Sequence, residues 1–207
     1  MDLLSNQNIL LYLAAYLIAG IPFGYVLAKQ FAGVDIKSAG SGNIGATNVL
    51  RVVKEQDPGL AKKLGAITLF LDAIKGVVVI LVAKFLGAPE GVLWTIAVLA
   101  VLGHCFSLFL AFDGGKGVAT GFGVLLVMMP VPALIAIVVW LGAAKGLKVS
   151  SLSSLIGLTA FIIASYLLYP EVPEIGSHAP VWIIALVIFY KHIPNIIRLF
   201  KKEEGKV

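Results

Sequence analysis

The chain has 207 residues, of which 59% are hydrophobic and 13% are charged, and its mean hydropathy is +1.00. This balance excludes an ordinary soluble globular domain and indicates an integral membrane protein. The formal net charge is +5, but the basic residues lie between apolar runs and form no stripe with interleaved aromatic residues, so nucleic acid is not expected as a partner. Because a crossing takes about 20 apolar residues, the whole of 1–207 is expected to form a single transmembrane domain.

Five apolar runs are each about long enough to cross a bilayer as one helix. They cover 9–29, 64–86, 91–112, 152–169 and 180–199. The residues before the first run include no Lys or Arg, so they lack the basic region of a cleaved signal peptide. The first span is therefore expected to stay attached.

The segment 117–147 is interrupted by Pro130 and Pro132 and is too short for two helices of full length. Loop charge distinguishes one crossing from two. If the segment is a hairpin, 14 of the 16 Lys and Arg residues lie on one side, with Lys84 opposite and Lys75 within a span, as the positive-inside rule requires. We therefore predict an all-α integral membrane protein with seven transmembrane helices, two short central spans, the N-terminus outside and the C-terminus cytosolic.

A glycine-rich segment follows the first span, within the predicted cytosolic region 30–63. Such a loop can turn its backbone N–H groups toward an anion. A helix beginning near Thr47 would aim Arg51 at the same site. A flexible linker is the alternative interpretation. The phosphate-binding candidates here are Ser41, Gly42, Asn43, Thr47 and Asn48.

In the second span, Asp72 and Lys75 are three residues apart and lie on one helix face. Opposite charges within a membrane bundle can neutralise each other. We interpret this pair as structural.

A second glycine-rich segment, Gly114, Gly115, Lys116 and Gly117, joins the third span to the central hairpin. It fails the P-loop pattern, because Gly117 stands where Ser or Thr is required and no strand precedes it. Small residues and a lysine before a helix still suit an anion, although a tight turn is an equal alternative. His104, about two turns inside the preceding span, is either catalytic or a hydrogen-bonded structural residue.

Two further polar groups lie near predicted cytosolic helix ends. Ser150 and Ser151 begin the sixth span, where hydroxyls either cap the helix or bind an oxyanion, and capping is the simpler interpretation. His192 and Asn195 share one face of the last helix near its cytosolic end, where His192 is either a functional residue or a satisfied interfacial histidine. No histidine has a carboxylate at ligand spacing, so no metal site is expected, and the single cysteine, Cys105, excludes an internal disulfide.

Together these segments resemble the bacterial glycerol-3-phosphate acyltransferase family that uses acyl phosphate as donor, the PlsY family. The resemblance extends over essentially the whole chain and agrees in order and spacing. It rests on 40–48 with Arg51, on Gly103 and His104 with 114–120, on Ser151 and Leu152, and on His192, Asn195, Arg198 and Leu199. Two positions differ: Val149 stands where an aromatic residue commonly precedes the serine pair, and Lys202 where the tail usually has Gly, which leaves any role of Glu204 open.

The resemblance implies a multi-pass enzyme of the bacterial inner membrane with its active site on the cytosolic face. It would transfer an acyl group from acyl phosphate to the 1-hydroxyl of sn-glycerol 3-phosphate, giving 1-acyl-glycerol 3-phosphate (lysophosphatidic acid) and phosphate, the first acylation step of phospholipid synthesis. No metal or other cofactor is implied. The expected partners are the two substrates, membrane lipid and, as a candidate, the enzyme that produces acyl phosphate.

Acyl phosphate is already activated, so direct attack by the glycerol hydroxyl needs no covalent acyl-enzyme. The proton acceptor is left open among His104, His192 and an oxygen of the donor phosphate; the phosphate is slightly favoured because neither histidine has a carboxylate partner in sequence. The catalytic candidates are Lys116, Arg51, His104 and His192. The substrate-binding candidates are Ser41, Gly42, Asn43, Thr47, Asn48, Gly114, Gly115, Gly117, Ser151 and Asn195.

Two other classes share some of these features. A transporter for a phosphorylated metabolite would need a site reachable from both sides, whereas the polar motifs gather on one predicted face. A non-catalytic lipid-binding protein would use basic loops to hold anionic headgroups, but charge attraction alone does not need the glycine spacing.

Overall fold

The computed structural model describes residues 6–172 and 174–205, and these residues form helices and no strands. The helices are α1 (Gln7–Gly20), α2 (Phe23–Ala32), α3 (Ala46–Val53), α4 (Pro58–Phe85), α5 (Glu90–Cys105), the 3₁₀ turn η2 (Leu108–Leu110), α6 (Val118–Met128), α7 (Pro130–Leu147), α8 (Ser150–Leu168) and α9 (Ala179–Phe200).

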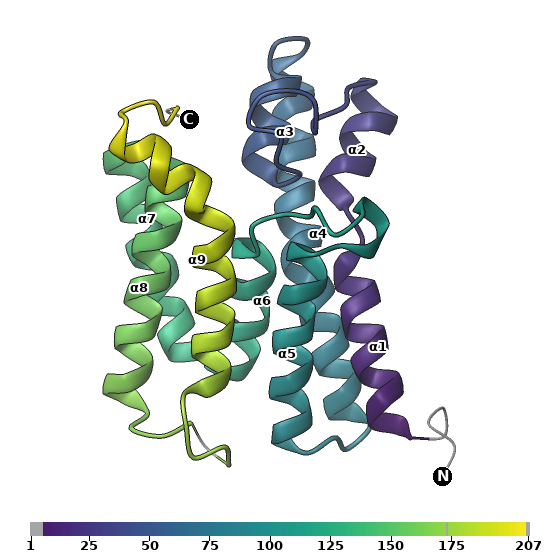
Figure 1. Ribbon diagram of the computed structural model, residues 1–207, viewed down its shortest axis with the longest axis vertical. Helices are drawn as coiled ribbons and strands as arrows, with labels where there is room; N and C mark the ends of the chain where they lie inside the picture. The colour runs from purple at the N-terminus through teal and green to yellow at the C-terminus, as the bar shows by residue number, and fades with distance from the viewer. Residues whose placement is uncertain (1–5, 173, 206–207) are drawn as a thin grey trace.

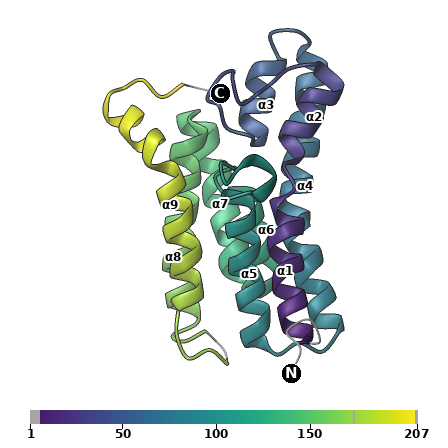
Figure 2. The ribbon, with the colours of Figure 1, turned by 45° about the vertical axis from the view of Figure 1, so that its right-hand side comes forward.

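The helices run up and down the long axis in two groups (Figure 1). One group holds α1, α2, α3, α4 and α5, and the other holds α7, α8 and α9, with α6 between them (Figures 1 and 2). The short helix α6 packs on α4 and α5 on one side and on α7 on the other. It therefore joins the two groups through the centre of the molecule.

The membrane class and the predicted spans agree with this architecture. Within the described residues, six helical segments are long and apolar enough to cross a membrane. They are Gln7–Ala32, Pro58–Phe85, Glu90–Leu110, Pro130–Leu147, Ser150–Leu168 and Ala179–Phe200. Large apolar side chains also face outward, including Phe70, Val138 and Leu167, as lipid-facing residues do.

The central segment 117–147 forms two helices, α6 and α7, as predicted. Met129, which precedes Pro130, leaves the helical conformation at φ −142° and ψ 74°, because a following proline disfavours the helical region. Pro130 then begins α7, where its missing N–H is not needed. Only α6 is short: its 11 residues rise roughly 16 Å, whereas α7 has 18 residues.

Helix α6 approaches α4 backbone to backbone. A methyl group added at Gly123 would overlap the carbonyl oxygen of Ala73, and one added at Gly76 would lie 2.6 Å from the Val124 side chain. Small residues allow this close approach in membrane bundles, where dispersion contacts between helices contribute much of the packing energy. The glycines thus fix the height of α6 against α4.

The first span is broken between α1 and α2, at Ile21 and Pro22. The carbonyls of Gly20 and Ile21 accept hydrogen bonds from Ser107 Oγ at 2.6 Å and Lys75 Nζ at 2.9 Å. Unpaired carbonyls are costly within a bilayer. The break is therefore stabilised by Ser107, in the loop after α5, and by Lys75 of α4. In Figure 1 the loop after α5 lies at the same height as the break between α1 and α2.

We predict that Gly123→Val lowers the thermal unfolding temperature, because the added side chain meets backbone that cannot move aside; overpacking costs about 1–3 kcal/mol. The matched control is Gly142→Ala in α7, where a methyl group meets nothing within 4 Å. Thermal unfolding of both proteins in the same detergent measures the difference. Equal unfolding temperatures would contradict the close packing of α4 and α6.

Candidate functional site

A cavity of about 440 Å³ lies where α3, the start of α6, the start of α8 and the end of α9 meet. All the sequence-predicted site residues except Gly42, Gly114 and Gly115 line it. Those that line it are Ser41, Asn43, Thr47, Asn48, Arg51, His104, Lys116, Gly117, Ser151, His192 and Asn195. Residues as far apart in the chain as Ser41 and Asn195 thus share one cavity, as the sequence predicted for a single site.

The first glycine-rich loop is shaped by Asn48, which is buried. Its Nδ2 donates to the carbonyls of Ile36 and Ala39 at 2.9 and 3.1 Å, and its Oδ1 accepts from the backbone N–H of Ser41 at 2.8 Å. A side chain at Gly40 (φ +61°) would overlap Asn48 Oδ1. The loop is therefore fixed, which excludes the flexible-linker interpretation, and Asn48 acts by holding it.

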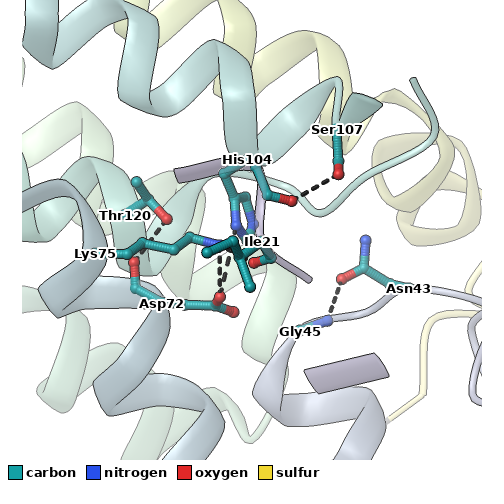
Figure 3. Close-up of polar contacts among 9 residues, drawn as sticks. Ile21, Asn43, Gly45, Asp72, Lys75, His104, Ser107 and Thr120 are labelled. Carbon is teal, nitrogen blue, oxygen red and sulfur yellow. Dashed lines mark hydrogen bonds and ion pairs between the residues drawn. The ribbon is translucent and has the colours of Figure 1, made fainter. Parts of the chain in front are cut away.

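The loop continues into α3, which begins at Ala46, beside the predicted start at Thr47. The side chain of Asn43 accepts from the backbone N–H of Gly45 at 2.9 Å, immediately before the helix (Figure 3). Thr47 and Arg51 are one turn apart and both line the cavity. Thr47 Oγ1 lies 3.0 Å from Ser150 Oγ, so this hydroxyl pair links α3 to α8 across the site.

The second loop uses its glycines differently from the prediction. The N–H groups of Gly114 and Gly115 donate to the carbonyls of Cys105 and His104, at 3.2 and 3.0 Å. Both glycines are buried, and a side chain at either would overlap His104. Their amides are therefore already paired, and Lys116 and Gly117 are the residues of this segment that line the cavity. A contact of Gly114 or Gly115 with substrate stays a prediction.

Lys116 stands in a partly buried, positively charged region. Burial lowers the pKa of its ammonium to about 8, the carboxylate of Glu204 opposes this change, and the charges of Arg198, Arg51 and Lys191 reinforce it. An ammonium held among other cations favours an anionic partner. The cavity is thus electrostatically suited to phosphate.

His104 lies in the last turn of α5, which ends at Cys105, and the apolar span that contains it continues to Leu110, so His104 lies inside the span as predicted. Its Nδ1 is 3.7 Å from Asp72 Oδ1, and both residues are buried (Figure 3). The predicted ion pair between Asp72 and Lys75 is confirmed at 2.8 Å. However, Asp72 also lines the cavity. His104 has no carboxylate partner close by in the sequence, but α4 brings Asp72 next to it in space.

His192 is also buried, with 1% of its surface exposed. Its Nδ1 lies 2.8 Å from the carbonyl of Ile188. A carbonyl oxygen can only accept, so Nδ1 carries the hydrogen and Nε2 of the neutral ring is an acceptor. His192 therefore has a nitrogen suited to receive a proton or a hydrogen bond from substrate.

Glu204, for which the sequence indicates no definite role, lies at the centre of a hydrogen-bond network. Its Oε1 accepts from Ser151 Oγ at 2.7 Å and Asn195 Nδ2 at 2.6 Å, and its Oε2 accepts from Arg198 Nε at 2.7 Å. Burial alone would raise the pKa of this carboxyl, but the three donors together lower it. The ionised carboxylate therefore holds the tail against α8 and α9.

The tail reaches this position through Lys202, whose φ is +58°. This left-handed conformation favours glycine, and another residue there costs about 1–2 kcal/mol. Lys202 occupies the position at which the PlsY family usually has Gly. The chain therefore keeps the left-handed backbone conformation at this position, although Lys202 adopts it less easily than glycine would.

The predicted capping role of the serines at the start of α8 is wrong. The residue before the helix is Val149, which makes no side-chain cap. Ser150 contacts Thr47, and Ser151 donates to Glu204. Both serines line the cavity. Within the described parts of the chain, no group of three or more His, Cys, Asp or Glu residues is arranged to hold a metal ion.

Comparison with known proteins gives one consistent result. A family model described as "Glycerol-3-phosphate acyltransferase" matches residues 9–202. Curated relatives of that description include one from Wolinella succinogenes, 59% identical over 100% of both chains, and one from Sulfurimonas denitrificans, 61% identical over 100% of both chains.

Two solved structures are also similar. Both are crystal structures of PlsY (YgiH), described as an integral membrane glycerol 3-phosphate acyltransferase. The glycerol 3-phosphate form has a TM-score of 0.86 and 36% identity, and the match covers 98% of this chain and 96% of that one. The lysophosphatidic acid form has a TM-score of 0.84 and 36% identity, over 97% and 95% of the two chains.

We predict that affinity for a phosphate monoester falls as the pH rises through about 8, because Lys116 is charged below its pKa of about 8 and loses its charge above it. The second pKa of a phosphate group is about 6, so the ligand itself is already doubly charged over this range. Titration by calorimetry at a series of pH values measures the effect. In Lys116→Ala the affinity should be lower and the fall near pH 8 absent; an unchanged fall in that variant would assign the titration to another group.

Proposed function

The chain belongs to the glycerol-3-phosphate acyltransferase family, and from this we propose that it transfers an acyl group from acyl phosphate to the 1-hydroxyl of sn-glycerol 3-phosphate. The products are 1-acyl-glycerol 3-phosphate and inorganic phosphate. The observation that carries the proposal is the convergence of Arg51, Lys116 and Arg198 with several hydroxyl groups around one cavity. Both substrates bear phosphate, and charged hydrogen bonds bind it strongly.

The cavity also has an apolar part. Leu69 of α4, Val118 of α6 and Trp140 of α7 line it beside the polar groups. An acyl phosphate needs both kinds of surface, because its head is anionic and its chain is apolar. A volume of about 440 Å³ lies within the usual range for small-molecule sites.

In the proposed reaction, the glycerol hydroxyl oxygen attacks the acyl carbon, and the bond between that carbon and the phosphate oxygen breaks. The proton of the hydroxyl passes to the departing phosphate, so atoms and charge balance without a covalent enzyme intermediate. Arg51 and Lys116 hold phosphate and stabilise charge as it develops. Arg51 can do so through two parallel hydrogen bonds, and Lys116 as a point charge.

The choice of proton acceptor follows from the surroundings of the two histidines. His104 shares Asp72 Oδ1 with the ammonium of Lys75, and that positive charge opposes a second one on the imidazole. His192 has an accepting nitrogen but is buried, which also disfavours a charged ring. The donor phosphate is therefore preferred, and His192 is the second candidate.

We further propose a bacterial inner-membrane location, seven crossings including α6, an outside N-terminus and a cytosolic active site. The bacterial relatives support the location, and the loop charge supports the orientation. The loop before α3, the start of α8 and the tail, which line the cavity, lie toward the end of the molecule where α2 and α9 finish, and the loop before α6 lies nearer its middle (Figure 1). A transporter would need an opening at the opposite end as well.

We predict turnover of acyl phosphate and glycerol 3-phosphate by the purified protein in detergent without added metal, and little or none with acyl-CoA. Phosphate release is measured together with lysophosphatidic acid by mass spectrometry, and omission of glycerol 3-phosphate controls for hydrolysis of the donor. Arg51→Lys keeps the charge but loses the planar fork, so its activity should be strongly reduced. Equal turnover with acyl-CoA, or loss of activity in EDTA that metal restores, would contradict the proposal.

We also predict that reporter fusions in bacteria mark 84–90 and 169–179 as outside. The reason is that 14 of the 16 Lys and Arg residues lie in segments on the other side. A fusion within 54–63 serves as the cytosolic control. A cytosolic signal at 169–179 would mean that α6 and α7 together cross only once, and the proposed orientation would be wrong.

A further inference from the structure

We propose that Asp72 and His104 form a positioning pair that fixes the loop carrying Lys116. The inference rests on the proposed function, because its effect is measured on acyl transfer. It assigns a positioning role to a carboxylate that the sequence pattern indicated to be purely structural, and it gives His104 a role in holding the loop. The pair is drawn in Figure 3, where the two side chains face each other from α4 and α5.

Asp72 is held firmly at both its backbone and its carboxylate. Thr120 Oγ1 donates to its carbonyl at 2.7 Å, and Lys75 Nζ donates to its Oδ1 at 2.8 Å. The same Lys75 ammonium donates to the carbonyl of Ile21. All three side chains of this group, Asp72, Lys75 and Thr120, are at most 3% exposed. The carboxylate is therefore a fixed acceptor within the bundle.

His104 has an unused group that faces this acceptor. Its Nδ1 is buried and has no hydrogen-bond partner within 6–172 and 174–205, and it lies 3.7 Å from Asp72 Oδ1. Buried polar atoms with no partner are rare. A shift of the ring by about 1 Å would bring the two atoms to hydrogen-bond distance. With Nδ1–H donating to Asp72, the tautomer and the plane of the imidazole are set.

His104 in turn fixes the loop through two contacts with Gly115. Its carbonyl accepts from the N–H of Gly115 at 3.0 Å. Its ring fills the space beside the same glycine, so that a methyl group there would overlap Nε2 and lie within 3.0 Å of two further ring atoms. A rotation of the ring would therefore displace Gly115, and with it the adjacent Lys116 in the cavity.

Two amide substitutions separate this role from its alternatives. In His104→Asn the side-chain amide nitrogen takes the place of Nδ1, and in His104→Gln it reaches the place of Nε2. The positioning role predicts that Gln lowers kcat/KM for glycerol 3-phosphate by about 100-fold, as displacement of a catalytic group by about 1 Å can do, and that Asn retains clearly more activity than Gln. If the Gln variant is more active than the Asn variant, the important atom is Nε2 and the proposal is wrong. Equal activity of the two variants would also contradict the proposed positioning pair.

Steady-state kinetics on equal amounts of monodisperse protein distinguish positioning from folding. A purely structural role would reduce the yield of folded protein and leave kcat and KM of the remainder unchanged, which would overturn the inference. If the wild-type protein shows no acyl transfer, that result contradicts the proposed function and does not bear on the contact between Asp72 and His104. In an Asp72→Ala/Lys75→Met background, which removes both buried charges together, the difference between Asn and Gln should disappear; its persistence would exclude Asp72 as the partner.

A second measurement uses the overlap at Gly115. Gly115→Ala alone should reduce kcat/KM, because the methyl group pushes the imidazole or the loop aside. Adding His104→Asn removes the ring atoms that the methyl group meets, so the double variant should be more active than Gly115→Ala. Failure of the second substitution to restore any activity would show that the ring does not set the loop, whatever the yields of the two proteins.

Discussion

A carbonyl that loses its helical partner within a bilayer must find another donor inside the protein, and the centre of this molecule is built around that requirement. At the break between α1 and α2, the carbonyl of Gly20 accepts from Ser107, and the carbonyl of Ile21 accepts from Lys75 as well as from the N–H of Phe23. Lys75 is neutralised by Asp72, whose own carbonyl receives Thr120 of α6. One interruption of the first span thus links four separate segments of the chain beside the cavity, which Asp72 lines.

The two groups of helices each supply part of the cavity, so its integrity depends on contacts between them. Thr47 and Ser150 meet across the site, and α6 packs against both groups. The tail contributes a different kind of contact, because the Glu204 carboxylate gathers Ser151, Asn195 and Arg198. These polar contacts join α3, α8, α9 and the tail around a charged cavity. Apolar packing alone would close that cavity.

Much of this arrangement follows from local pattern. Apolar run length locates the spans, prolines divide the central segment, and the spacing of Asp72 and Lys75 predicts their ion pair. What sequence could not indicate depends on which groups meet in space. The amides of Gly114 and Gly115 are used by the end of α5, and His104 meets Asp72 only because α4 and α5 lie side by side. Glu204 reaches Ser151 only because Lys202 bends the backbone back, and nothing in its immediate sequence marks that bend.

The shortness of α6 determines the depth at which the chemistry is placed. A helix of 11 residues covers roughly half of a hydrocarbon core of about 30 Å, and α6 begins well below the ends of α2, α7 and α9 (Figure 1). In the proposed orientation, Lys116, which lies immediately before α6, is therefore placed deeper than those helix ends. A water-soluble substrate can descend to this level while an acyl chain stays among the lipid tails. In the proposed reaction, the short helix therefore lets a water-soluble acceptor and a lipid-embedded acyl donor meet in one cavity.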